Sequence, residues 1–130
     1  MPIYSLLILE DETAHVEAVR RAFESAEPPA EIRVASTLRE YCELVEARPP
    51  DIALIDLNLP DGNPQEALNL LSGNNPFPVV VMTSMGNEAV AVAAMKLGAA
   101  DYLVKSSETF ADMPHFIHRT VLAREVASHE

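Results

Sequence analysis

The sequence predicts a doubly wound α/β fold, in which helices cover both faces of one five-stranded parallel sheet. Five short apolar runs alternate with segments of helical periodicity, and proline or glycine separates most of them. The chain has 130 residues, of which 48% are hydrophobic, so we expect one domain over residues 1–130 with a packed core. Five such units without a repeat predict the flavodoxin-like strand order 2-1-3-4-5 and five helices.

The first half of the chain supplies three strands and two helices. The strands are the apolar runs Ile3–Leu9, Ile32–Ala35 and Ile52–Asp56. Apolar residues on one face predict a helix from about Glu12 to Ser25, which a proline pair ends. The residues Thr37 to Glu40 have the spacing of a capping box, so a second helix is expected to follow and to reach about Ala47.

The second half supplies two strands and three helices. The strands are Val79–Met82, which is uniformly apolar, and Tyr102–Val104. An N-cap residue followed by proline predicts a short helix from Asn63 to about Leu71. A fourth helix is expected over Glu88–Leu97, where Gly98 stops it. The last helix should run from about Met113 to Ala127, because Pro114 is best tolerated in a first turn.

Polar residues stand at the carboxyl ends of four of these strands, and parallel strands bring those ends to one edge. Asp56 ends the third strand, and Glu10 and Asp11 follow the first; Thr83 follows the fourth strand and Lys105 the fifth. Each has an ordinary explanation: Asp11 could cap a helix, Asp56 could be a solvated acid, threonine suits a strand, and lysine often lies at an edge.

Together these side chains have the groups that one reaction, phosphoryl transfer, requires. Crowded carboxylates repel unless a cation neutralises them, and a few hard oxygen ligands suit Mg²⁺. An ionised aspartate beside such a metal can attack a phosphoryl group and form an acyl phosphate. The charge of the transition state then needs an ammonium and a hydroxyl donor, which Lys105 and Thr83 supply. The set predicts metal-assisted phosphoryl transfer.

Four motifs make the resemblance specific: LLILEDE, ALIDLNLPDG, VVVMTS and GAADYLVK, each at the end of a predicted strand. Over essentially its full length the chain resembles a response-regulator receiver domain of two-component signalling. The resemblance implies that Asp56 accepts a phosphoryl group from a histidine kinase or a histidine phosphotransfer protein. Such a domain is expected to catalyse its own phosphorylation and dephosphorylation without being a conventional enzyme.

The resemblance also implies a role for each residue of the pocket. Glu10 and Asp11 match the acidic pair that binds Mg²⁺, with Mn²⁺ as a second choice, and Asp56 and the main-chain carbonyl of Asn58 complete that site. Thr83 and Lys105 match the hydroxyl and the ammonium that close on the phosphoryl group. The remaining assignments are Tyr102 as the aromatic switch, and Asn58 and Met85 as the positions that modulate the lifetime of the phosphoryl group.

Phosphorylation is expected to change the face built from the fourth helix, the fifth strand and the last helix. That face would then act on a downstream protein, on a linked sensory or kinase module, or on a second copy in a homodimer. The net charge of −11 argues against direct binding of nucleic acid. The absence of an apolar run long enough to span a membrane and the single cysteine fit a cytoplasmic protein.

One departure from the family pattern affects the face that is expected to change on phosphorylation. Ser106 follows Lys105, where the family usually has proline, often after a cis peptide bond. We therefore expect residues 106–112 to be rearranged and the signalling face to differ from the common one. The Lys-Ser pair and the long last helix resemble receivers that lead into sensory or kinase modules, which favours a domain excised from a longer protein over a stand-alone receiver.

Two other functions compete with this interpretation. A pseudo-receiver would act as an interaction module without phosphorylation, but the complete polar set argues against a degenerate pocket. A phosphatase of the haloacid-dehalogenase type would also use Asp56 as nucleophile. That class places a second aspartate two residues later, where this chain has Asn58.

Overall fold

The computed structural model describes residues 4–58, 69 and 76–128, and it confirms the predicted sheet. Five parallel strands lie in the order β2-β1-β3-β4-β5. The strands are β1 (Tyr4–Leu9), β2 (Ala30–Ala35), β3 (Ile52–Asp56), β4 (Val79–Thr83) and β5 (Asp101–Val104). The described helices are α1 (Thr13–Phe23), α2 (Leu38–Ala47), α4 (Glu88–Leu97) and α5 (Ser107–Ser128). Apart from residue 69, the helix predicted over residues 63–71 lies outside the described residues.

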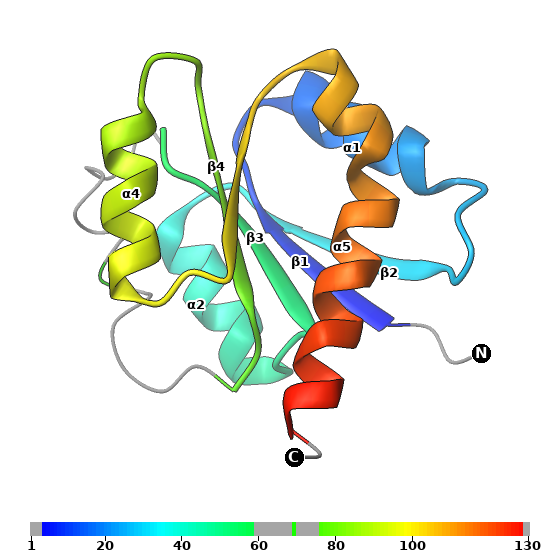
Figure 1. Cartoon of the computed structure of the whole chain (residues 1–130). Coiled ribbons are helices and arrows are strands. Elements are labelled where there is room, and N and C mark those ends of the chain that lie inside the picture. Colours follow the sequence, from blue (N-terminus) through cyan, green and yellow to red (C-terminus); the bar gives the residue numbers. More distant parts are fainter. Residues whose placement is uncertain (1–3, 59–68, 70–75, 129–130) are drawn as a thin grey trace.

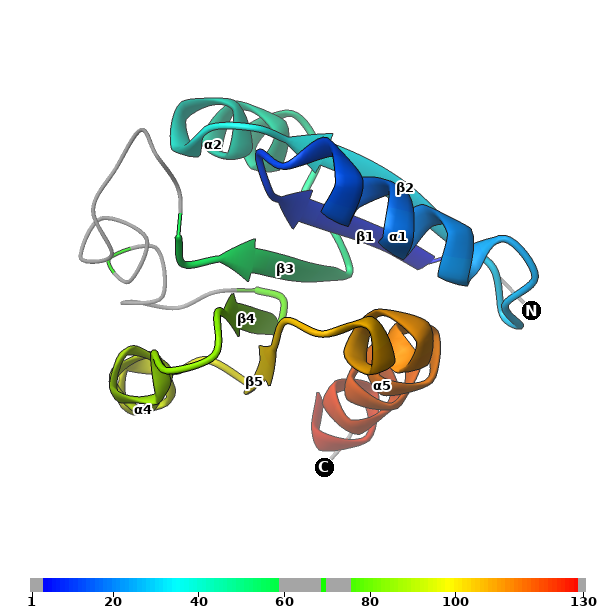
Figure 2. The same ribbon diagram turned by 90° about the horizontal axis from the view of Figure 1, so that it is seen from above.

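Helices cover both faces of the sheet, as Figures 1 and 2 show: α1 and α5 lie on one side, and α2 and α4 on the other. Each face has its own apolar core. Facing α1 and α5, side chains such as Leu6, Leu54 and Ile117 pack together. Facing α2 and α4, the core includes Leu9 and Ile55. Every residue of β3 and β4 is buried, because both strands are internal and covered twice.

The helix ends follow the predicted signals where those signals are local. The hydroxyl of Thr37 accepts a hydrogen bond from the N–H of Glu40 at 3.0 Å, and the carboxylate of Glu40 accepts one from the N–H of Ser36. Gly98 ends α4 in the left-handed region, at φ +119°. The N-cap residue of α1 is Glu12, and its side chain makes no capping hydrogen bond. Asp11 therefore lies before the cap and is not used to start the helix.

The prediction for the last helix was wrong at its start. Helix α5 begins at Ser107, so Pro114 lies inside it rather than in its first turn. The peptide bond before Ser106 is trans. The Ser106 hydroxyl accepts a hydrogen bond from the N–H of Thr109 at 3.0 Å and caps the helix in place of the usual proline. The predicted rearrangement of residues 106–112 is therefore a regular helical start.

Packing explains why α5 continues through a proline. Phe110 and Met113 are buried against the sheet, and they continue the apolar stripe that Ile117 and Val121 form after the proline. A proline removes one backbone hydrogen bond and crowds the preceding turn. Burial of two large side chains offsets that cost, so tertiary contacts prevail over the local signal. None of the described helices is long and apolar enough to cross a membrane.

Candidate functional site

Three charged side chains meet at the carboxyl edge of the sheet. Asp56 ends β3, Glu10 follows β1 and Lys105 follows β5. The ammonium Nζ of Lys105 lies 2.8 Å from Oδ2 of Asp56 and 3.0 Å from Oε1 of Glu10. Both acids are only 1% exposed. Buried carboxylates require a partner, and the lysine is the cation that lies between them.

The surroundings give the two carboxyl groups different proton affinities. Burial, and then the neighbouring Asp56, raise the pKa of Glu10 to about 8. Burial would also raise the pKa of Asp56, but hydrogen bonds with Glu10, Lys105 and the N–H of Asn58 outweigh it and hold that pKa below its ordinary value. Burial disfavours the charged form of Lys105, yet the two acids raise its pKa overall. Without metal, the surroundings therefore favour the ionised form of Asp56 over the ionised form of Glu10.

Three acids at this edge form a group that fits a small, hard cation. One carboxylate oxygen from each of Glu10, Asp11 and Asp56 lies within 4.8 Å of the other two. Asp11 is exposed, so the group opens to solvent on its side. An all-oxygen set with an open side suits Mg²⁺, which keeps some of its waters.

Thr83 brings a buried hydroxyl to the same edge. Its residue is 1% exposed, and its Oγ1 has no hydrogen-bond partner among the described residues. Its carbonyl accepts a hydrogen bond from the N–H of Lys105 at 2.9 Å, which joins the ends of β4 and β5. Leaving a buried hydroxyl without a partner is costly, so its presence calls for a ligand or a conformational change that satisfies it.

Asn58 connects the acceptor strand to the loop after β4. Its N–H donates to Oδ1 of Asp56 at 2.9 Å, and its Nδ2 donates to the hydroxyl of Ser84 at 3.2 Å. The amide of Asn87 donates to both Oδ1 of Asn58 and the Ser84 hydroxyl. Asn58 is therefore held at both ends, with its main chain bonded to Asp56 and its side chain to the loop after β4.

The two remaining predicted residues lie at the surface. Met85 is 80% exposed in the loop after β4, close in sequence to the network above. Tyr102 is 38% exposed on β5, the edge strand of the sheet. Neither has a described contact with the acids, so the structure assembles Glu10, Asp11, Asp56, Thr83, Lys105 and Asn58 and leaves Met85 and Tyr102 outside the charged group.

Sequence reasoning missed His15. Its Nδ1 lies 2.5 Å from Oε1 of Glu10 and 3.3 Å from Nζ of Lys105. The residue belongs to α1, five positions after Glu10 and in the first turn of the helix. That spacing matches no helical or strand period, so the reach of the ring creates a contact that no pattern signals.

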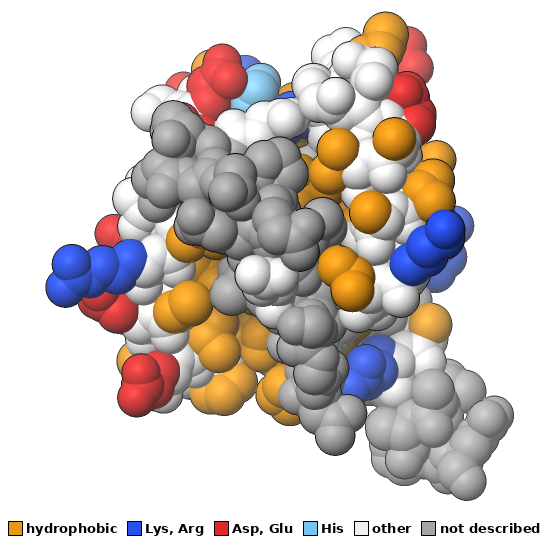
Figure 3. All heavy atoms as spheres, turned by 90° about the vertical axis from the view of Figure 1, so that its left-hand side faces the viewer, with side chains coloured by type: hydrophobic (Ala, Val, Ile, Leu, Met, Phe, Trp, Pro, Cys, Tyr) orange, Lys and Arg blue, Asp and Glu red, His pale blue; other side chains and the backbone are white. Residues whose placement is uncertain are grey.

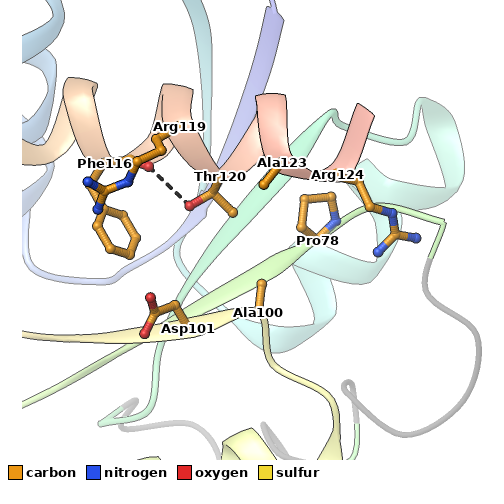
Figure 4. Close-up of a pocket in the computed structure, with 8 residues that line it drawn as sticks. All are labelled: Pro78, Ala100, Asp101, Phe116, Arg119, Thr120, Ala123 and Arg124. Carbon is orange, nitrogen blue, oxygen red and sulfur yellow. Dashed lines mark hydrogen bonds between the residues drawn. The ribbon is translucent and has the colours of Figure 1, made fainter. Parts of the chain in front are cut away.

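A cavity of about 470 Å³ lies apart from this site, between α5 and the amino ends of β4 and β5. Its lining consists of Pro78, Ala100, Asp101, Phe116, Arg119, Thr120, Ala123 and Arg124 (Figure 4). None of the predicted site residues borders it. The chemistry therefore belongs to the shallow acidic edge rather than to this cavity.

Comparison with known proteins agrees with that geometry. Residues 6–114 match the family model described as the response regulator receiver domain. The chain belongs to the response regulator receiver family. This receiver is 39% identical over 108 residues to the acid tolerance regulatory protein ActR of Rhizobium meliloti, and 40% identical over 105 residues to the photosynthetic apparatus regulatory protein RegA of Rhodobacter capsulatus.

The receiver spans about half the length of these curated relatives. The matches cover 82% and 80% of this chain but 55% and 56% of ActR and RegA. Among solved structures, the receiver domain of a LuxO repressor protein from Vibrio parahaemolyticus superposes with a TM-score of 0.82 at 22% identity, covering 98% of this chain and 96% of that one. The Mn²⁺-bound form of the response regulator Rcp1 superposes with a TM-score of 0.75 at 25% identity, covering 88% and 91%.

Proposed function

We propose that this receiver stores a signal as a phosphoryl group on Asp56, taken from a histidine kinase or a histidine phosphotransfer protein. The observation that carries the proposal is the short ion pair between Asp56 and Lys105 inside a group of three acids. The low pKa of Asp56 keeps the acceptor ionised. An ionised carboxylate held beside a cation is what nucleophilic attack on a phosphoryl group requires.

In the transfer step, a carboxylate oxygen of Asp56 forms a bond to phosphorus while the bond from phosphorus to the histidine nitrogen breaks. The nitrogen keeps the bonding electrons and takes up a proton. Mg²⁺, or Mn²⁺ in its place, would be held by Glu10, Asp11, Asp56 and the carbonyl of Asn58, and would neutralise charge on the phosphoryl oxygens. The Rcp1 structure holds Mn²⁺, which supports a divalent cation as the cofactor.

The other two residues of the pocket stabilise the product. The ammonium of Lys105 compensates one phosphoryl oxygen, and the buried hydroxyl of Thr83 gains the partner that it lacks in this structure. The same pocket admits water, whose attack on phosphorus returns Asp56 to its carboxylate and releases phosphate. Phosphorylation and dephosphorylation are in this sense the domain's own activities.

The output is proposed to pass through the face of α4, β5 and α5. Movement of Thr83 toward the phosphoryl group opens space into which Tyr102 can turn. The neighbouring helix α4 already exposes Val92, Met95 and Leu97, and Figure 3 shows hydrophobic side chains spread over it. Such side chains suit a protein partner: a downstream protein, a linked sensory or kinase module, or a second copy of the receiver.

A pseudo-receiver that works without phosphorylation remains the alternative function. The complete set of Glu10, Asp11, Asp56, Thr83 and Lys105 argues against it, because a module that never handles a phosphoryl group has no need for a buried, desolvated acceptor with a lysine partner. Burial of charged groups such as these lowers the stability of the fold. An interaction module that is never phosphorylated would gain nothing from them.

Intact mass spectrometry after incubation with acetyl phosphate and Mg²⁺ tests the proposal. The parent protein should gain the mass of one phosphoryl group, and the variant Asp56→Asn should gain none. A parent protein that takes up no phosphoryl group from acetyl phosphate, and shows no NMR response to beryllium fluoride with Mg²⁺, would establish the pseudo-receiver instead.

A further inference from the structure

His15 occupies a position between the acidic pocket and the start of α5. Its ring nitrogen Nδ1 lies 2.5 Å from Oε1 of Glu10 and 3.3 Å from each of Nζ of Lys105 and Oε2 of Glu12. The other side of the ring stacks on Phe110, with the ring centroids 5.3 Å apart and the planes inclined by 30°. The side chain is 26% exposed, so it is neither a core residue nor a surface residue.

The contacts of His15 with Glu10 determine how that carboxyl group is presented. Oε1 of Glu10 contacts both His15 and Lys105, whereas Oε2 has a longer contact of 3.4 Å with Lys105. His15 contacts Oε1 from the side of α1, and this contact restricts the rotation of the carboxyl group. Oε2 then faces the acidic pocket. His15 does not belong to the group of acids whose oxygens lie within 4.8 Å of one another, so it acts on the acids from outside that group.

The stack on Phe110 extends the same contact to the start of α5. Phe110 is buried in the core under α5 and lies in the first turns of that helix. Stacked aromatic rings couple their positions, because the pair loses contact when either ring moves. One side chain, His15, therefore contacts both Glu10 and α5, and this connection includes neither Thr83 nor Tyr102.

We propose that His15 is a positioning residue, which orients the carboxyl group of Glu10 toward a bound divalent cation and connects that group to Phe110 at the start of α5. The inference rests on the proposed function, since it assumes that Glu10 is a metal ligand. Groups that hold a metal ligand from outside the coordination sphere change metal affinity by about 10- to 100-fold when they are removed. The proposal therefore predicts an effect on Mg²⁺ binding in the unphosphorylated protein.

Two substitutions separate the two contacts of the ring. His15→Phe keeps the stack on Phe110 and removes the nitrogen. His15→Asn keeps a side-chain nitrogen at the place of Nδ1, because both are three bonds from Cα, and removes the ring. The matched control is His115→Phe, the same substitution at an exposed position of α5. Thermal unfolding of each variant first establishes that it folds.

Mg²⁺ titrations of the parent and the three variants, followed by NMR, provide both readouts. We expect His15→Phe to weaken Mg²⁺ binding about tenfold while the resonances of Phe110 still shift at saturating Mg²⁺. We expect His15→Asn to bind Mg²⁺ within about twofold of the parent while the Phe110 shift falls by at least half. The control His115→Phe should match the parent in both its Mg²⁺ affinity and its Phe110 shift.

Three outcomes overturn the inference: equal Mg²⁺ affinity in the parent and His15→Phe, an equal loss of affinity in both His15 variants, or a parent that binds no Mg²⁺. An equal loss in both variants shows that His15 acts only through general packing. Labelling with acetyl phosphate at saturating Mg²⁺ keeps the two proposals apart. If the Mg²⁺ pattern holds but the parent takes up no phosphoryl group, the proposed function fails and the role of His15 stands.

Discussion

Lys105 and Asp56 lie 49 residues apart in sequence, and their charged atoms Nζ and Oδ2 lie 2.8 Å apart in the folded chain. The contact exists because β3 and β5 both end at the carboxyl edge of the sheet, on either side of β4. It gives the buried acid a partner in the absence of a phosphoryl group. In the proposed transfer, it also places the ammonium where charge would develop.

Removing the ammonium should affect chemistry more than metal binding. We expect Lys105→Met to lower the rate of phosphorylation by acetyl phosphate on the order of 10²-fold, the usual effect of losing one donor to a transition-state charge. Mg²⁺ affinity should rise slightly, because a positive charge has left the acidic pocket. Rates from intact mass spectrometry and Mg²⁺ titrations check both parts. A rate within threefold of the parent would show that Lys105 only neutralises the buried acids.

Glu10 should make the stability of the metal-free protein depend on pH. Its pKa rises from 4.5 to about 8 on folding, so between these values the folded state binds a proton that the unfolded state does not. The stabilisation is complete below about pH 4.5 and is lost as the pH rises through about 8. The free energy of unfolding, measured in urea without metal, should therefore fall from pH 5 to pH 8.

The variant Glu10→Gln isolates this contribution, because glutamine does not titrate. The difference in unfolding free energy between parent and variant should change with pH in that window and level off above it. A constant difference from pH 5 to pH 9 would show that Glu10 is ionised throughout in the folded protein.

Asp11 should matter for the metal and not for the fold. It is exposed, lies before the helix cap and has no described hydrogen bond. We expect Asp11→Asn to leave the melting temperature without metal unchanged within about a degree, or slightly raised, because the ionised carboxylate of Asp56 lies nearby. The rise in melting temperature on adding Mg²⁺ should be much smaller than in the parent. An unchanged Mg²⁺-dependent rise contradicts the assignment of Asp11 as a ligand.

Ser106 should stabilise α5 as its N-cap. The substitution Ser106→Ala removes the acceptor for the N–H of Thr109 and should cost about 1 kcal/mol of unfolding free energy. Ser107→Ala is the matched control, since that neighbouring serine is exposed and lies inside the helix. Urea unfolding of both variants gives the comparison. Equal stability of the two would mean that Ser106 does not cap the helix.

Met85 should give the phosphorylated form a long lifetime. Its thioether cannot orient a water molecule as an acid or an amide can, and it is 80% exposed beside the pocket loop. We expect decay over minutes or longer after acetyl phosphate is removed, and faster decay in Met85→Glu, which restores a group able to hold water. A parent lifetime of seconds contradicts this expectation.

Features that depend on local pattern could be predicted from the sequence. Strand β3 and helix α4 have the predicted bounds, because a fully apolar run and a glycine stop act over a few residues. The contact between Asp56 and Lys105 could also be predicted from the sequence, since the sheet topology alone brings the ends of these strands together. The start of α5 did not follow, because buried Phe110 and Met113 outweigh the local effect of a proline.

The position of His15 beside the pocket could not be predicted either. Its contact with Glu10 depends on where the ring points from the first turn of α1 and on how Phe110 packs against its other face. Such contacts come from the packing of α1 against α5, elements at opposite ends of the chain. A sequence pattern records the elements but not the distances between their side chains.

The central claim is that Asp56 is the nucleophile. Borohydride reduces an aspartyl phosphate to homoserine, so peptide mapping after treatment with acetyl phosphate, Mg²⁺ and borohydride identifies the acceptor directly. We expect homoserine at position 56 alone, and none when Mg²⁺ is removed by a chelator. Homoserine at Asp11 or another acid, or labelling that persists in Asp56→Asn, would contradict it.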